Sequence, residues 1–303
     1  MKDQAEQLRN LANTTWADKT RAAAAATRST RILAISSGKG GVGKTNVVVN
    51  VALAMARQMH RVLILDADLG LANIDVVMGI TPRFNLQHVI NGQKSIRDVV
   101  VQGDFGIQVI SGGSGLADLA NLSDTQRDAL IGSLAELESM ADVLLVDTGA
   151  GIGPNVLQFI LAAQELIIVT TPEPTAITDA YSLIKVVSRL SSDVPLKLLV
   201  NQVRTVKEAE EITANIVGVA RRFLHLEVGS YGHLPYDSNL IKAVRRQMPV
   251  LTAYPNSPAA FAFHGLAARI WNEEPPEMQI KPGILNFFRR IVKANEFEET
   301  RRG

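Results

Sequence analysis

The chain has 303 residues and a formal net charge of +1, with 31 Lys and Arg against 30 Asp and Glu, so bulk charge gives no argument for nucleic-acid binding. It contains no cysteine, which excludes disulfides, iron–sulfur clusters and thiolate metal sites. The first twenty residues have no signal-peptide core and no apolar run reaches the length of a membrane span, so we expect a cytoplasmic protein.

Residues 1–30 precede the first predicted strand. They carry a short helical pattern followed by Ala22–Ala26, a low-complexity stretch typical of a linker or a frayed helix. We therefore expect residues 1–30 to form an N-terminal segment outside the folded core.

A glycine-rich loop follows the apolar run Ile32–Ser36, which predicts a buried strand, and precedes a helical pattern at Asn46–Met59. The loop fits the G-x-x-x-x-G-K-[ST] pattern, whose backbone N–H groups bind the phosphates of ATP or ADP at a helix N-terminus. We expect Lys44 to reach the β- and γ-phosphates and the Thr45 hydroxyl to bind Mg²⁺. The alternative is a purely structural glycine turn. The residues of this loop are Gly38, Lys39, Gly40, Gly41, Val42, Gly43, Lys44 and Thr45.

Two carboxylates mark the end of the second predicted strand. Asp66 and Asp68 stand where the apolar run Val62–Asp66 gives way to a loop. At this spacing both can point toward one site, where one orders Mg²⁺-bound water and the other orients the attacking water. The alternative is a polar loop capped by aspartates.

A third carboxylate, Asp147, ends the apolar run Val143–Asp147. An Asp after four apolar residues is typical of a Walker B strand, where it holds Mg²⁺, usually through water. We therefore predict a metal site that includes Thr45, Asp147 and one of the two carboxylates that end the second strand. The alternative for Asp147 is an N-cap of the next helix.

Apolar runs alternate with helical patterns through most of the chain. This alternation predicts an α/β fold with a doubly wound, mostly parallel sheet of about seven or eight strands and helices on both faces. Ligands of such sheets bind beyond the carboxyl ends of the strands, where the motifs above lie. The predicted strands are Ile32–Ser36, Val62–Asp66, Ile107–Ser111, Val143–Asp147, Leu166–Thr171, Leu196–Asn201 and Val228–His233. The helical patterns include Ser123–Met140, Thr175–Leu190 and Val206–Leu226.

Three prolines within residues 273–282 mark a boundary after the predicted nucleotide domain at 31–272. In the final segment, 273–303, apolar residues from Ile284 onward share one helical face, and basic residues rim the other. This pattern predicts a helix over 283–293 that lies in the plane of a membrane and binds anionic lipid. The alternative is a final helix docked on the core.

The motifs together resemble the deviant P-loop of the MinD/ParA group over about residues 31–265. The resemblance implies a P-loop ATPase that forms a homodimer around ATP, in which Lys39 crosses to the partner's phosphates, Asp68 activates water and Asp66 lies nearer the metal. For Lys39 the alternative is a solvated loop lysine. The resemblance also implies a group of residues around adenine, in which an Asn reads the base edge, an Arg stacks on the ring and a Pro-x-Asp backbone packs beside it: Asn201, Arg204, Pro235 and Asp237.

The residues Asp3–Arg9 are similar to the D-Q-A-x-x-L-R signature of the flagellar-number ATPases called FlhG, FleN or YlxH, and Asp66–Asp75 and Glu173–Tyr181 look like the same subgroup. This resemblance implies a regulator of flagellar number and placement that acts with the GTPase FlhF and with flagellar C-ring proteins. It also implies reversible binding to the inner face of the cell membrane. For Asp3–Arg9 the alternative is a short tail without function.

A ParA-type DNA-partition ATPase is the competing function. The pairs Arg221-Arg222 and Arg245-Arg246 could begin a basic surface for DNA, although each pair also suits a solvated helix face. The phenylalanines of the last helix and the Asp3–Arg9 motif favour the flagellar regulator, so we do not expect nucleic acid as a partner.

Overall fold

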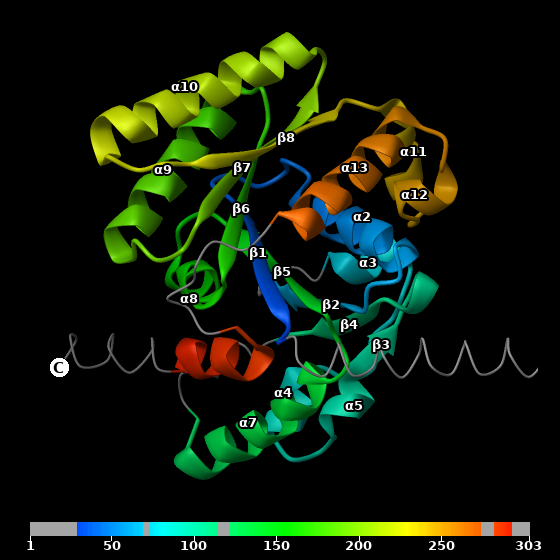
Figure 1. The fold of residues 1–303 in the computed structure, drawn as a ribbon. Coiled ribbons are helices and arrows are strands. Elements are labelled where there is room, and N and C mark those ends of the chain that lie inside the picture. Colours follow the sequence, from blue (N-terminus) through cyan, green and yellow to red (C-terminus); the bar gives the residue numbers. More distant parts are fainter. Residues whose placement is uncertain (1–28, 69–72, 114–121, 274–281, 293–303) are drawn as a thin grey trace, which may run out of the picture.

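The computed structural model describes residues 29–68, 73–113, 122–273 and 282–292. An eight-stranded sheet with the order β3-β4-β2-β5-β1-β6-β7-β8 forms its centre (Figure 1). All neighbouring strands are parallel except β3, which is antiparallel to β4. The strands are β1 Arg31–Ser37, β2 Val62–Ala67, β3 Val100–Gln102, β4 Gln108–Ser111, β5 Val143–Ala150, β6 Glu165–Thr170, β7 Leu196–Val203 and β8 Gly229–Pro235.

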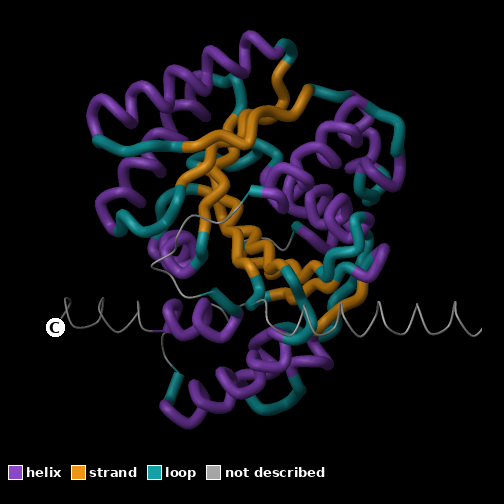
Figure 2. The backbone as a smooth tube through the Cα atoms, in the orientation of Figure 1, coloured by secondary structure: helices purple, strands orange, loops and turns teal. Residues whose placement is uncertain are grey.

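Helices cover both faces of this sheet, as the tube drawing shows (Figure 2). One hydrophobic core lies under α2, α3, α12 and α13, and the other lies under α4, α5, α7, α8, α9 and α10. The helices are α2 Lys44–Arg57, α3 Ile74–Met78, α4 Leu86–Ile90, α5 Ile96–Val99, α7 Asp124–Glu138, α8 Pro154–Ala162, α9 Pro174–Leu190, α10 Val206–Leu224, α11 Ser238–Arg245, α12 Val250–Ala253 and α13 Pro258–Asn272, with a short 3-10 turn η1 at Asp104–Gly106.

The predicted doubly wound fold is confirmed, and each predicted strand corresponds to an observed one. The sequence analysis did not predict β3, because this edge strand has only three residues and lacks a continuous buried run. The predicted motifs follow or end β1, β2, β5, β7 and β8, so they gather at the carboxyl edge of the sheet. The Asp3–Arg9 motif lies outside the described residues.

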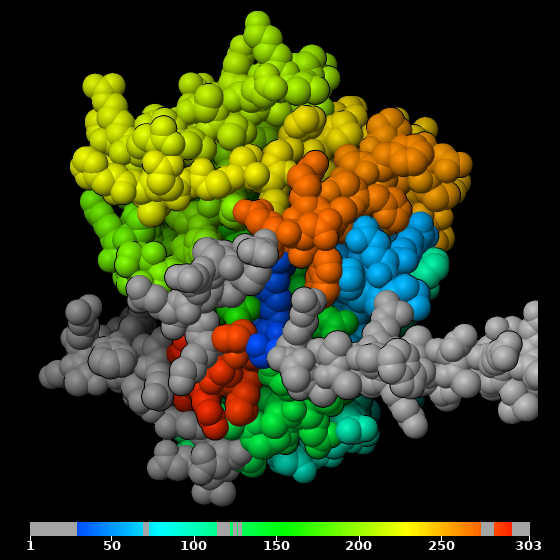
Figure 3. Space-filling model, in the orientation of Figure 1, coloured from blue at the N-terminus to red at the C-terminus, as the bar shows by residue number. Residues whose placement is uncertain are grey.

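The C-terminal helix, residues 284–292, is docked on the core. Ile284, Phe287 and Ile291 are fully buried, and the ring of Phe287 lies 6.4 Å from that of Phe159 in α8. In the space-filling view the red atoms of this helix sit directly against the green atoms of the lower part of the molecule (Figure 3). Of the two alternatives drawn from the sequence, docking on the core describes this conformation. No helix among the described residues is long and apolar enough to cross a membrane.

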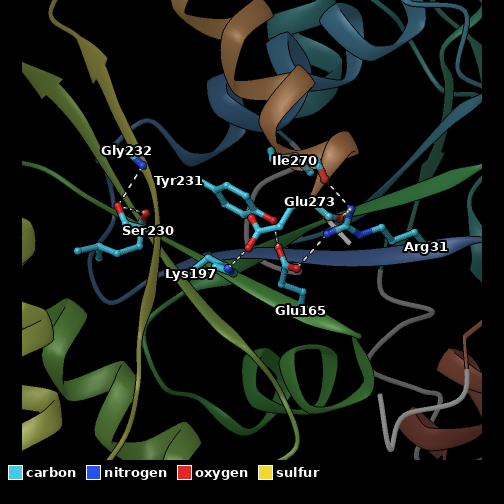
Figure 4. Close-up of polar contacts among 9 residues, drawn as sticks. Arg31, Glu165, Lys197, Ser230, Tyr231, Gly232, Ile270 and Glu273 are labelled. Carbon is cyan, nitrogen blue, oxygen red and sulfur yellow. Dashed lines mark hydrogen bonds and ion pairs between the residues drawn. The ribbon is translucent and has the colours of Figure 1, made fainter. Parts of the chain in front are cut away.

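A buried polar network ties the amino edge of the sheet to the end of α13 (Figure 4). The Glu165 carboxylate accepts a hydrogen bond of 2.5 Å from the Tyr231 hydroxyl and pairs with Arg31 at 3.0 Å. Arg31 also donates to the carbonyl of Ile270, and Lys197 pairs with Glu273. Burial and the Glu165 charge raise the pKa of Tyr231, so its hydroxyl stays a donor. The network fixes the end of α13 against the amino edge of the sheet.

Candidate active site

The phosphate-binding loop connects β1 to α2 and has the backbone that its glycines allow. Gly41 and Gly43 have φ values of 81° and 89°, a region in which L side chains are strained. A Cβ at Gly43 would lie 2.6 Å from Nδ2 of Asn201, and the same Nδ2 donates a 2.8 Å hydrogen bond to the Val42 carbonyl. Asn201 therefore supports the loop from the end of β7.

The loop also lies directly against α9. A Cβ at Gly38 would come within 2.1 Å of the Asp179 carbonyl oxygen, which no side chain permits. Glycine at this position therefore sets the distance between the loop and α9. This close approach joins residues that are far apart in the sequence, and the glycine pattern alone did not indicate it.

Lys44 begins α2 and is buried at the carboxyl edge of the sheet. Its Nζ lies 3.6 Å from Oδ1 of Asp147, in the carboxyl-terminal half of β5. The helix N-terminus adds partial positive charge at the same place. Lys44 can therefore reach phosphates bound by the loop while it offsets part of the Asp147 charge.

Asp66 and Asp147 are neighbours across the β2–β5 ladder, and both are buried. Burial, followed by the Asp147 charge, raises the pKa of Asp66 to about 7. Burial also raises the pKa of Asp147, against the opposing influence of Lys44 and Thr45. Two buried carboxylates side by side are costly unless a cation compensates them.

These residues fit a bound Mg²⁺. Neither carboxylate oxygen of Asp147 accepts a hydrogen bond of normal length from the described residues. The described residues contain no group of three or more His, Asp or Glu arranged to hold a metal, and Mg²⁺ is usually held by one or two carboxylates together with phosphates and water. Thr45, Asp66 and Asp147 would hold it, and the ion would neutralise charge on the phosphate oxygens.

Asp68 follows β2 and is partly buried beside the end of β5. The Asp68 backbone N–H donates to Oδ1 of Asp66 at 3.2 Å. A Cβ built at Gly149 would lie 3.6 Å from Oδ1 of Asp68. The side chain therefore lies next to Gly149, near the carboxyl end of the Walker B strand β5. From this position Asp68 can orient a water, which stays a prediction; residues 69–72 of the same loop lie outside the described residues.

Lys39 is held within its own chain. Its Nζ lies 2.7 Å from Oε2 of Glu173 and 2.9 Å from Oγ1 of Thr175, at the start of α9. Both charged side chains are substantially exposed, so the pair is weak and exchangeable. The sequence analysis did not predict this ion pair, because it considered Glu173 only as part of a motif that resembles the flagellar subgroup. The predicted crossing of Lys39 to a partner is not tested by this single chain.

The predicted adenine residues lie together at the ends of β7 and β8. Pro235 ends β8, and the next N–H, from Tyr236, donates to the Val203 carbonyl at 2.8 Å. The guanidinium carbon of Arg204 lies 6.0 Å from the ring centre of the exposed Tyr236. Tyr236 is a further candidate for contact with the base at this end of the site. Its position between Pro235 and Asp237 in the sequence could have indicated it.

Asp237 has a structural role that the sequence analysis did not predict. One carboxylate oxygen accepts the Asn239 N–H at 2.8 Å and caps α11, while the other accepts the Ala259 N–H at 3.0 Å near the start of α13. Contact of the Pro235–Asp237 backbone with adenine, and reading of the base by Asn201, remain predictions.

Comparisons with known proteins agree with this geometry. The ParA family model, described as NUBPL iron-transfer P-loop NTPase, matches residues 28–271. The antiactivator FleN of Pseudomonas aeruginosa is 42% identical over 264 residues, which cover 87% of this chain and 94% of FleN. The flagellum site-determining protein YlxH of Helicobacter pylori is 34% identical, with 88% and 90% of the two chains covered.

Solved structures show the same fold. The septum site-determining protein MinD of Pyrococcus horikoshii, complexed with Mg-ADP, matches with a TM-score of 0.64 at 24% identity and covers 80% of this chain and 96% of its own. From the family match, the FleN and YlxH similarity and the phosphate-binding geometry, we conclude that this chain belongs to the ParA/MinD family of P-loop ATPases.

Proposed function

We propose that this ATPase is an ATP-switched homodimer that regulates the number and placement of flagella. The observation that carries the proposal is the 42% identity to the antiactivator FleN over 87% of the chain. The similarity to the flagellum site-determining protein YlxH supports the same role. The complete phosphate-binding loop and the neighbouring carboxylates Asp66 and Asp147 supply the ATPase chemistry that such a switch needs.

The dimer would form when the γ-phosphate of ATP bound to one copy of the chain contacts a second copy. Lys39 lies at the outer edge of the loop and is bound only by the exposed Glu173 and by Thr175. Because an exposed ion pair contributes little, Lys39 can leave it for the partner's phosphates at small cost. Lys44 serves the phosphates within its own chain, and Asp68 orients the attacking water, so hydrolysis to ADP ends the dimer.

The C-terminal helix would carry the membrane contact. Its large apolar side chains contribute at most about 1.5–3 kcal/mol each on full burial, and each basic residue near anionic lipid adds about 1 kcal/mol. In the docked conformation Ile284, Phe287 and Ile291 are already buried, so lipid binding requires release of the helix. Two helices on one dimer would bind with avidity on the order of a hundredfold or more above a single helix.

Partners would meet two parts of the chain. The Asp3–Arg9 motif, outside the described residues, is proposed to contact the GTPase FlhF, and the dimer surface is proposed to contact C-ring proteins. Both assignments rest on the subgroup resemblance. The resulting location is the cytoplasm, with reversible attachment to the inner face of the cell membrane.

Sedimentation with ADP or ATP, with and without vesicles containing anionic phospholipid, tests the proposal. We expect a monomer in the supernatant with ADP and a dimer that pellets with vesicles in ATP. The same distribution with both nucleotides would contradict the switch. A DNA mobility shift in ATP would instead favour partition, although Arg221 is already paired with Glu227 at 2.7 Å.

A further inference from the structure

Three segments that are distant in the sequence meet at one carboxylate, Glu138, the last residue of α7. Its Oε1 accepts the backbone N–H of Thr30 at 3.1 Å, where the chain enters β1. Its Oε2 accepts the backbone N–H of Ile284 at 2.6 Å, where the C-terminal helix begins. One side chain thus holds the end of the N-terminal segment and the start of the C-terminal helix.

The backbone joins the same two segments directly. The Gly283 N–H donates to the Thr30 carbonyl at 3.2 Å. Gly283 has a φ of 108°, and a Cβ there would lie 2.8 Å from Oε1 of Glu138. The positive φ favours glycine at this position, and a larger residue would also push the carboxylate aside. Thr30 is itself held in place, because its hydroxyl donates to the Ala141 carbonyl at 2.8 Å.

The neighbouring residue, Arg31, holds the end of α13. Its guanidinium donates to the carbonyls of Ile270 and Glu273 at the end of α13 (Figure 4). The chain therefore lies beside Arg31 at Glu273, where α13 ends, and beside Thr30 at Gly283, just before the C-terminal helix. Thr30 and Arg31, which are adjacent in the sequence, thus contact the chain at both places.

We propose that Glu138 is a latch that couples the N-terminal segment to the docking of the C-terminal helix. A partner that binds upstream of Thr30 can pull its N–H away from the Glu138 carboxylate. The carboxylate is then less firmly positioned, and its hydrogen bond to the Ile284 N–H becomes weaker. Release of the helix, in turn, removes the Gly283 N–H from the Thr30 carbonyl and so loosens Thr30. Coupling between two sites is reciprocal, so each event favours the other by the same factor.

This coupling goes beyond the proposed function. It concerns the docking of the C-terminal helix on the core, and it holds for any ligand that the released helix binds. Only its use as a link between a flagellar partner and lipid rests on the proposed function. The test below contains neither lipid nor partner, so failure of the latch is distinguishable from failure of the membrane role.

The chain has no cysteine, so a single introduced thiol can report docking in the full-length protein. Val292→Cys places that thiol on the buried face of the C-terminal helix, where a thiol reagent reaches it only after undocking. Adding Glu138→Gln should speed labelling about tenfold to a hundredfold, the effect of losing one hydrogen bond to a charged group. The matched control is Glu136→Gln, because Glu136 lies in the same turn of α7 but pairs with the exposed Arg97. Equal labelling in the two variants would overturn the latch.

Thr30→Pro, compared with Thr30→Val, tests the coupling, because both variants lose the hydroxyl that donates to Ala141 and only the proline loses the N–H that Glu138 accepts. We expect Thr30→Pro to speed labelling of the thiol more than Thr30→Val does. In the double variant with Glu138→Gln the two effects should not add, since both break the same latch. Additive effects, or no effect of Thr30→Pro, would show that the two segments are independent.

Hydrogen exchange decides the matter should Thr30→Pro unfold. In the parent sequence, Phe287→Glu undocks the helix by placing a carboxylate in the core, and exchange at the Thr30 amide should then rise about tenfold or more. Unchanged exchange at Thr30 with the helix undocked would also overturn the proposal.

Discussion

The amino and carboxyl edges of the sheet differ in how their buried carboxylates are compensated. At the amino edge the buried Glu165 accepts from Tyr231 and pairs with Arg31, so its charge is compensated within the chain. At the carboxyl edge Asp66 and Asp147 are neighbours, and the pKa of Asp66 is raised to about 7. Fully paired charge at the amino edge stabilises the fold, whereas the incompletely compensated carboxylates at the carboxyl edge mark a candidate ligand site.

The largest expected effect breaks the carboxyl edge alone. Lys44→Ala removes the buried cation beside Asp147 and the phosphates, so we expect ATP affinity to fall by at least about a hundredfold. Isothermal calorimetry with ATP and Mg²⁺ measures this change. Lys197→Ala, at the amino edge, is the matched control and should leave ATP affinity unchanged; an unaltered affinity in Lys44→Ala would contradict the phosphate assignment.

Asp68→Ala separates binding from chemistry at the same edge. The loop, Lys44 and Asp147 remain, so ATP should still bind, while loss of the water-orienting carboxylate should lower kcat by about 10²–10⁴-fold. A phosphate-release assay with saturating ATP measures turnover, and light scattering should detect an accumulated ATP-bound dimer. Normal turnover would remove Asp68 from its assigned role.

The amino edge is broken by Glu165→Ala. This change leaves Arg31 and the Tyr231 hydroxyl buried without their partner, and we expect unfolding free energy to fall by about 3–5 kcal/mol. The control is Glu136→Ala, which removes an exposed pair with Arg97 and should cost about 0–1 kcal/mol. Urea unfolding compares the two, and similar losses would refute the view that the amino edge fastens the fold.

The sequence predicted the parts of each edge that are local. Gly38–Thr45 and Asp147 have short patterns in which residue type and spacing already imply the chemistry. Contacts between distant segments have no such pattern: Lys39 meets Glu173, and Glu138 meets Ile284, only after the chain folds. The apolar stripe of the C-terminal helix could not decide between lipid and core, because both bury the same helical face.

Lys39→Ala concerns the mouth of the site, where the ion pair with Glu173 is exposed. Folding and ADP binding should change little, since an exposed pair contributes about 0–1 kcal/mol. ATP-dependent dimers should be absent, because Lys39 is proposed to reach the partner's phosphates. Sedimentation velocity with ATP measures the dimer, with Glu173→Gln as a control that leaves Lys39 available. Dimers of Lys39→Ala like those of the parent would make Lys39 an ordinary loop lysine.

The smallest expected effect is also the most direct test of the contrast between the edges. Asp66→Asn removes one of the two neighbouring buried carboxylates, and with it the repulsion and part of the desolvation cost that raise its pKa. We therefore expect the nucleotide-free protein, in a metal chelator, to gain about 2 °C or more in Tm. The same variant should lose much of the additional stabilisation that Mg²⁺ and ATP give the parent, because one proposed ligand to the metal is gone. Thermal unfolding in both conditions measures the two shifts. If the variant is instead less stable without ligand, Asp66 stabilises the fold as Glu165 does. The two edges would then not differ in how buried charge affects stability.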